Sequence, residues 1–213
     1  MTRIADFVAE LTSIEIGGDA ISLWRVADLE QHVDREALLA GDDPPEPPYW
    51  AHLWTGALVL AGAVPPDGGR VLELGCGIGL PGLVAACRGA RVTFVDRLAA
   101  PLIFVRASAA ANRLGPVDVC VADFTGEALR GPFDLILAAE VLYDLSTLGT
   151  LPQTLRRCLR PGGRALLTDA RRTDTAAFYT GLDASGLPWR VAEHAVREEG
   201  LPLTVRLVEV GCP

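Results

Sequence analysis

Two short stretches of this 213-residue sequence contain the residue types that ligand binding and catalysis need. One is the glycine-rich run Val71–Gly82, in which Gly75, Gly77 and Gly79 alternate with other residues. Glycines that end a strand let the backbone approach a ligand closely at a helix N-terminus. The other stretch holds Glu140 and Tyr143, a carboxylate and a hydroxyl three residues apart. Together they can attract and hold a positively charged amine.

The glycine run fits two patterns. Gly77-x-Gly79-x-x-Gly82 matches the dinucleotide fingerprint, and Asp96 lies 19 residues after Gly77, where a ribose-binding acid belongs. Gly75-x-Gly77-x-Gly79, preceded by Glu73, matches a different group of nucleotide-binding proteins. The glycines alone do not decide between the two patterns.

The elements around the glycine run predict an α/β fold. Nearly continuous apolar strands alternate with helices, which indicates a parallel sheet covered on both faces. We expect strands at Arg70–Leu74, Arg91–Val95, Val117–Val121, Phe133–Ala139 and Ala165–Thr168, and helices at Thr55–Ala63, from the glycine turn to about Arg88, at Leu98–Asn112 and at Leu148–Leu159. Trp189–Val196 and Leu203–Val210 are separated by too few residues for a crossover helix, so they are expected to be antiparallel. Dinucleotide dehydrogenases normally continue with parallel strands, and this ending disfavours them.

The N-terminal part has a different pattern. Two alternating runs, Ser13–Ile16 and Ala20–Val26, flank Gly17 and Gly18 and predict a β-hairpin. A proline-rich segment at residues 42–48 is too stiff for a helix or a sheet and is read as a hinge. We therefore expect an appendage and linker at residues 1–47 and the main domain at residues 48–213.

Composition excludes several classes of protein. The formal net charge is −8 and every basic residue is arginine, so general affinity for nucleic acid is not expected. No apolar run reaches membrane-spanning length, we expect no signal peptide, and a cytoplasmic location is the default expectation. The cysteines are scattered and odd in number, which predicts neither disulfides nor a metal site: Cys76, Cys87, Cys120, Cys158 and Cys212.

Several motifs in the expected order give the sequence a family resemblance over about residues 50–210. Leu72–Gly79 resembles the first motif of the class I, seven-stranded S-adenosylmethionine-dependent methyltransferases. Asp96 ends the second strand, Ala122–Phe124 follows the third, and Phe133–Leu137 forms the fourth. The resemblance implies a doubly wound, Rossmann-like, seven-stranded, mostly parallel sheet with an antiparallel C-terminal hairpin. It also implies S-adenosylmethionine as cofactor and S-adenosylhomocysteine as product.

A narrower resemblance concerns the acceptor of the methyl group. Pro48–Trp54 and Ala139–Asp144 are similar to segments of the lysine-methyltransferase branch, which includes the electron-transfer-flavoprotein β-subunit enzyme. This branch implies a protein substrate with an accessible lysine. Residues 168–172 are only loosely similar to the flavoprotein enzyme, so that particular substrate does not follow.

The resemblance assigns roles to individual residues. Asp96 would accept hydrogen bonds from both ribose hydroxyls. Glu73 would face the methionine end of the cofactor or order the loop, Asp123 would accept from the adenine amino group, and Phe124 would lie against the ring. Trp54 would pack on the cofactor or belong to the core. The remaining cofactor-binding residues would be Gly75, Cys76, Gly77, Gly79, Arg97 and Ala139.

Glu140 and Tyr143 are the expected catalytic residues, and a helical turn starting at Glu140 would aim both to one side. A small-molecule N-methyltransferase, acting on a nicotinamide-like amine, is the first alternative. A non-catalytic, cofactor-binding partner protein is the second. The N-terminal hairpin could cover a small pocket or help to hold a protein, and both interpretations remain open.

Overall fold

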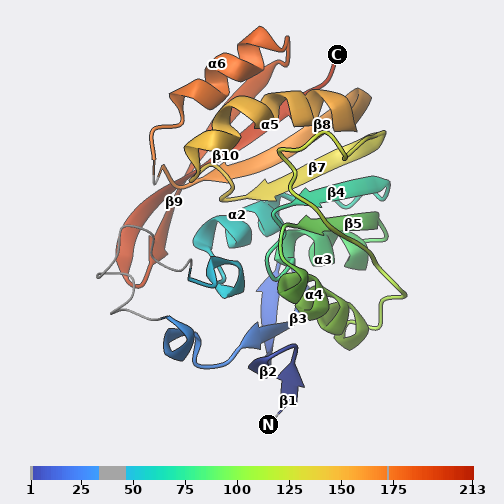
Figure 1. The fold of residues 1–213 in the computed structure, drawn as a ribbon, viewed down its shortest axis with the longest axis vertical. Coiled ribbons are helices and arrows are strands. Elements are labelled where there is room, and N and C mark those ends of the chain that lie inside the picture. The colour runs from blue at the N-terminus through green and yellow to red at the C-terminus, as the bar shows by residue number, and fades with distance from the viewer. Residues whose placement is uncertain (1, 34–46, 172) are drawn as a thin grey trace.

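The computed structural model describes residues 2–33, 47–171 and 173–213 (Figure 1). Seven strands form the main sheet in the order β6-β5-β4-β7-β8-β10-β9. Five of them are parallel: β4 (Arg70–Leu74), β5 (Arg91–Asp96), β6 (Asp118–Val121), β7 (Phe133–Ala139) and β8 (Leu159–Asp169). β9 (Trp189–Glu198) and β10 (Leu201–Gly211) form the antiparallel hairpin that ends the sheet. The predicted fold class is confirmed.

Helices cover both faces of the sheet (Figure 1). α2 (Thr55–Ala63), α3 (Leu80–Cys87) and α4 (Ala99–Ala111) lie on one face, and α5 (Leu145–Cys158) and α6 (Ala176–Ala184) lie on the other. Successive side chains of a strand point to opposite faces, so Val71 packs with the first group of helices and Leu72 with the second. This burial on both faces explains why the strands are almost continuously apolar.

The predicted N-terminal hairpin is present and belongs to a larger sheet. β2 (Phe7–Ile16) pairs with β3 (Asp19–Val26), and β1 (Thr2–Ile4) adds a third strand that the sequence did not predict. The free edge of β3 faces α4, where Ser108 accepts a hydrogen bond from the backbone of Trp24 at 2.9 Å and Asn112 one from Ser22 at 2.9 Å. The polar edge of the small sheet is thereby satisfied by helix side chains.

Several predicted boundaries were wrong. α5 begins at Leu145, one turn earlier than expected, because Asp144 accepts the backbone N–H of Ser146 at 2.8 Å and caps the helix. The composition of the Pro161–Gly163 segment predicts a turn, but β8 includes it. The backbone N–H of Gly162 donates to the carbonyl of Cys212 and so keeps the segment in the sheet. α6 was not predicted at all. The proline hinge before residue 47 lies outside the described residues.

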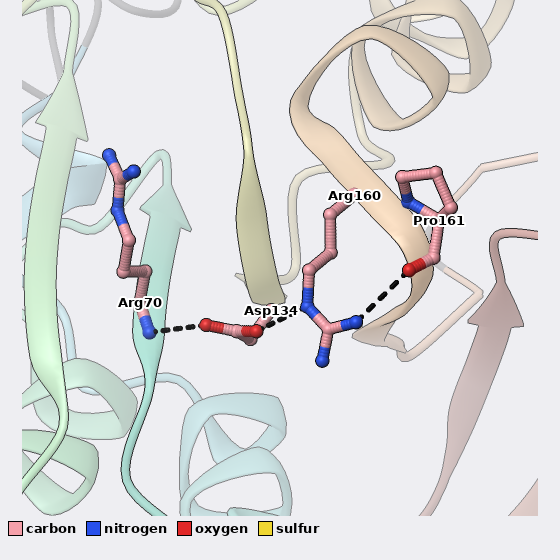
Figure 2. A network of polar contacts seen from close by, with 4 residues as sticks. All are labelled: Arg70, Asp134, Arg160 and Pro161. Atoms are coloured by element: carbon pink, nitrogen blue, oxygen red, sulfur yellow. Dashed lines mark hydrogen bonds and ion pairs between the residues drawn. The ribbon is translucent and has the colours of Figure 1, made fainter.

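A polar network joins the first residues of three strands at the edge of the sheet away from the glycine loop (Figure 2). The carboxylate of Asp134 accepts the backbone N–H of Arg70 at 2.7 Å and the guanidinium of Arg160, which also donates to the carbonyl of Pro161 at 3.0 Å. These hydrogen bonds hold the pKa of Asp134 below its usual range. The network fixes how β4, β7 and β8 start.

Candidate active site

A cavity of about 510 Å³ opens at the carboxyl ends of the parallel strands. This is the edge where open α/β sheets bind ligands, and the volume lies within the range of roughly 300–1,000 Å³ typical of small-molecule sites. All thirteen residues expected at the site line it: Trp54, Glu73, Gly75, Cys76, Gly77, Gly79, Asp96, Arg97, Asp123, Phe124, Ala139, Glu140 and Tyr143. The structure thus brings them together; their individual roles stay predictions.

The glycine loop between β4 and α3 needs glycine for two physical reasons. Gly75, Gly77 and Gly79 have φ angles of 56°, 50° and 77°, a left-handed conformation that other residues adopt only with strain. A Cβ atom on Gly77 would also lie 2.8 Å from the carbonyl oxygen of Trp50. The loop therefore presents bare backbone to the cavity and leads into the N-terminus of α3.

Glu73 in β4 lies next to the glycine loop and contacts the start of α3. Its side chain is 1% exposed, and Oε2 accepts the backbone N–H of Gly82 in the first turn of α3 at 3.0 Å. Burial raises the pKa of Glu73 well above its ordinary value, and the neighbouring Asp96 carboxylate adds to the rise. This hydrogen bond joins β4 to the first turn of α3, and both roles expected for Glu73 stay predictions.

Asp96 is held at the end of β5 by two backbone donors. Oδ2 accepts from Gly77 at 3.0 Å and Oδ1 from Leu98 at 3.1 Å. Burial raises the pKa of Asp96, while these two hydrogen bonds oppose the rise. Each carboxylate oxygen can accept more than one hydrogen bond, so the oriented group retains capacity for a pair of ligand hydroxyls.

The β6 end of the cavity contributes Asp123 and Phe124. Oδ1 of Asp123 accepts both the hydroxyl and the backbone N–H of Thr125, at 2.7 Å and 2.8 Å, which lowers the pKa of Asp123. Phe124 is half-buried and lies beside the glycine loop, where a Cβ on Gly75 would be 3.5 Å from its ring. An ionised acceptor next to an aromatic ring suits a flat, amine-bearing heterocycle.

Glu140 follows β7 in a left-handed conformation, with φ 53°, which is uncommon for a residue with a side chain. Its carboxylate accepts the backbone N–H of Ala170 at 3.3 Å and lies against the first turn of α2 at Gly56. No helical turn starts at Glu140, so the condition under which the three-residue spacing would aim both side chains to one side is not met. Glu140 and Tyr143 nevertheless both line the cavity, and Tyr143 is 50% exposed at its rim.

An aromatic wall of the cavity was not predicted from the sequence. Phe7 from β2 and His32 from the 3-10 turn η1 (Leu29–His32) line the cavity and contact each other with ring centroids 4.9 Å apart. Phe7 also contacts Trp50 in η2 (Tyr49–Ala51) at 5.2 Å. His52 lines the cavity too and packs edge-on against Trp54 at 4.4 Å. No local motif marks Phe7 or His32, because only tertiary packing brings the small sheet here.

The charge of the cavity is predominantly negative among the described residues. Besides the buried Glu73, four acids line it, namely Asp96, Asp123, Glu140 and Asp144, against one arginine, Arg97. Such a site favours ligands that carry positive charge. Within the same described part of the chain, no three His, Cys, Asp or Glu residues are grouped to hold a metal ion, and no helix is long and apolar enough to span a membrane.

Residues 49–202 match a methyltransferase domain family. Among curated proteins, the chain is 41% identical over 117 residues to the mouse protein N-lysine methyltransferase METTL21A, covering 49% of this chain and 53% of the relative. It is 31% identical over 166 residues to the Xenopus laevis electron transfer flavoprotein beta subunit lysine methyltransferase, and the match covers 74% of this chain and 66% of that relative. A Pseudomonas aeruginosa ubiquinone biosynthesis O-methyltransferase is 29% identical over 119 residues, and the match covers 55% of this chain and 51% of that relative. The matches span about half to two thirds of the length of these relatives.

Solved structures share the fold at low sequence identity. A Thermus thermophilus 16S rRNA methyltransferase in complex with AdoMet and guanosine superposes with a TM-score of 0.68 at 19% identity, covering 96% of this chain and 51% of that one. The N-methyltransferase NodS from Bradyrhizobium japonicum, in complex with S-adenosyl-L-homocysteine, superposes with a TM-score of 0.58 at 22% identity, covering 87% and 96%.

Proposed function

Because this chain belongs to the methyltransferase domain family and is a class I, S-adenosylmethionine-dependent methyltransferase, we propose that it methylates a lysine side chain of a protein substrate. One observation carries the proposal: Glu140 and Tyr143 line the same cavity as the glycine loop and Asp96. The lysine methyltransferases among its relatives support the choice of acceptor.

The cavity fits the cofactor. Its volume and its bare glycine backbone allow a nucleoside to approach, and Asp96 is oriented for the ribose hydroxyls. Asp123 would accept from the adenine amino group beside Phe124, with Trp54, Cys76, Arg97 and Ala139 completing the walls. When bound, S-adenosylmethionine supplies an electrophilic methyl group on a positively charged sulfur. The predominantly acidic lining suits both this cation and an incoming ammonium group.

Glu140 and Tyr143 act on the acceptor in this proposal. The Glu140 carboxylate attracts the lysine ammonium, and the Tyr143 hydroxyl hydrogen-bonds the nitrogen and orients it. A nearby carboxylate raises the pKa of an amine, so Glu140 contributes to binding more than to deprotonation. The amine would lose one proton to water, and the bond between its nitrogen and the methyl carbon would form as the carbon–sulfur bond breaks and S-adenosylhomocysteine leaves. Enclosure by the aromatic wall aligns the reactants and excludes other water.

The N-terminal segment and the main domain have different roles in this proposal. We propose that residues 1–47 act as an appendage to the methyltransferase domain at residues 48–213, with Phe7 and His32 forming part of the cavity wall. A small-molecule acceptor is the second candidate, because this aromatic wall encloses part of the cavity and one relative is an O-methyltransferase of ubiquinone biosynthesis.

The test separates the two candidates. The purified protein is incubated with methyl-labelled S-adenosylmethionine and a lysate of its source organism, and the products are divided into polypeptides and small molecules. Label in polypeptide that falls about 10- to 100-fold with Glu140→Gln supports the proposal, since a hydrogen bond to a charged group is worth about 1.5–3 kcal/mol. Label only in small molecules would overturn it. Glutamine retains an acceptor for Ala170, so this variant removes mainly the charge.

A further inference from the structure

The C-terminal hairpin continues past the rest of the sheet. β10 pairs with β9 from Leu201 to Val210, whereas its pairing with β8 begins only at Arg206, opposite Asp169. Residues 194–205 therefore form a two-stranded arm that extends beyond the carboxyl end of β8, at the same edge as the cavity. In Figure 1 the arm reaches down beside α2.

The arm is a preformed element. Leu201 pairs directly with Glu198, so its turn has only two residues, Glu199 and Gly200, with φ angles of 50° and 82°. Positive φ at both positions is the pattern of the type I′ turn, whose twist matches that of paired strands. The Arg197 guanidinium also donates to the carbonyl of Gly200 at 2.7 Å. A surface on such an arm can bind a partner with little loss of conformational entropy.

One face of the arm is connected to the mouth of the cavity. Glu198 accepts a hydrogen bond from the hydroxyl of Thr55 at 3.0 Å, and the residue before Thr55, Trp54, lines the cavity. Residues directly opposite each other in a hairpin share a face, so Leu201 lies on the same side as Glu198, followed by the pair Val196 and Leu203. Leu201 is 71% exposed there.

Exposed apolar side chains occur on the rim of the cavity as well. Tyr143 is 50% exposed, Leu145 70% and Tyr49 47%. Tyr49 and Tyr143 line the cavity, and Leu145 lies between Asp144 and Ser146, which also line it. A small methyl acceptor inside the cavity would not reach apolar groups on an arm beyond its mouth, whereas a polypeptide would.

We propose that the α2-facing side of the arm, with Glu198, Leu201 and the Val196–Leu203 pair, is a docking surface for the polypeptide that carries the target lysine. This deepens the proposed function and rests on it. The partner that fits is a segment with apolar residues and positive charge near the lysine. Glu198, Glu199 and Asp144 supply negative charge around the mouth, Arg197 lies on the opposite face of the arm, and the protein as a whole carries −8.

The test compares two exposed leucines. Leu201→Ser removes the apolar tip of the arm, and Leu11→Ser makes the same change at a 50% exposed leucine in β2 that does not line the cavity. The probe is the polypeptide fraction of the source-organism lysate, diluted so that initial rates report kcat/KM. We expect Leu201→Ser to lower labelling of polypeptide about tenfold and Leu11→Ser to leave it unchanged, with S-adenosylhomocysteine binding the same in both.

Equal labelling by Leu201→Ser and the unmodified protein would overturn the docking surface and leave the proposed function intact. If the unmodified protein labels no polypeptide in this fraction and labels only small molecules in the whole lysate, both the docking surface and the proposed function are overturned. Glu199→Gln provides a second variant in case Leu201→Ser loses S-adenosylhomocysteine binding. It removes a charge at the exposed turn, and an unchanged rate with this variant would then count against the proposal.

Discussion

Gly56 in the first turn of α2 should be essential for activity because of the space that its missing side chain leaves. A Cβ atom on Gly56 would lie 2.0 Å from Oε1 of Glu140 and 2.7 Å from both Cδ and Cγ. Ordinary contacts of a Cβ atom are about 3.4 Å or longer, so Gly56→Ala must displace the Glu140 carboxylate by roughly 1 Å or more. Misplacement by about 1 Å can reduce catalysis about 100-fold, which is the loss we expect in kcat/KM.

The effect of Gly56→Ala on stability should be much smaller than its effect on activity. Overpacking costs about 1–3 kcal/mol, and replacing glycine by alanine in a helix returns up to about 1 kcal/mol. The matched control is Gly62→Ala in the same helix, where a Cβ meets nothing within 4 Å. This control should keep full activity and gain up to about 1 kcal/mol in the free energy of unfolding.

The assay combines methyl transfer to polypeptide, S-adenosylhomocysteine affinity and thermal unfolding for both variants. The account also predicts that Gly56→Ala has no further effect in a Glu140→Ala background, because the residue it displaces is then gone. Full activity of Gly56→Ala would refute the reasoning. An equal loss of activity in the two backgrounds would show that Gly56 acts other than through Glu140.

Three further predictions follow from the polar groups of the fold. Asp96→Asn should weaken S-adenosylhomocysteine binding about 10- to 100-fold by calorimetry, because charge-assisted hydrogen bonds to the ribose are lost, and unchanged affinity would contradict the role of Asp96. Burial raises the pKa of Glu73, so the native state keeps a proton that the unfolded chain releases. The free energy of unfolding should therefore fall as the pH rises above the range in which an exposed glutamate titrates. Denaturant titrations of Glu73→Gln should lack that part of the fall. Hydrogen bonds from Arg70 and Arg160 lower the pKa of Asp134, so its contribution to stability is present above the pKa of an unfolded aspartate and is lost as the pH falls through the native pKa. Asp134→Asn should be less stable at neutral pH, and its free energy of unfolding should depend less on pH in the acid range. Identical plots of the free energy of unfolding against pH for the two proteins would exclude this network as a source of stability.

The architecture of the main sheet was predictable because its strands are buried on both faces. Strands such as Phe133–Ala139 are apolar almost throughout, and a parallel sheet between helices produces that pattern. The short spacing between the last two strands required an antiparallel pair, and the structure has one, in which Leu201 to Val210 pair with the preceding strand. The glycine loop was predictable for a similar reason, since three alternating glycines after a strand indicate left-handed backbone.

The contacts that complete the site were less predictable because they join distant parts of the chain. Phe7 and His32 reach the cavity only because the small N-terminal sheet packs on α4 through Ser108 and Asn112. Glu140 follows β7 with a left-handed backbone, and its carboxylate occupies the space that a side chain at Gly56 in α2 would take. The sequence does not indicate this contact, because neither residue alone marks it. The arm appears only when the pairing of β10 with β8 and with β9 is compared.

The most direct test of the central claim is to identify the methylated amino acid. Labelled polypeptide from the reaction is hydrolysed to amino acids, and the label is assigned by chromatography and mass spectrometry. The account predicts Nε-methyllysine, reduced about 10- to 100-fold with Glu140→Gln. The chain contains no lysine, so any methyllysine comes from the substrate and not from the enzyme itself. Label in another amino acid, or in small molecules alone, would contradict the account.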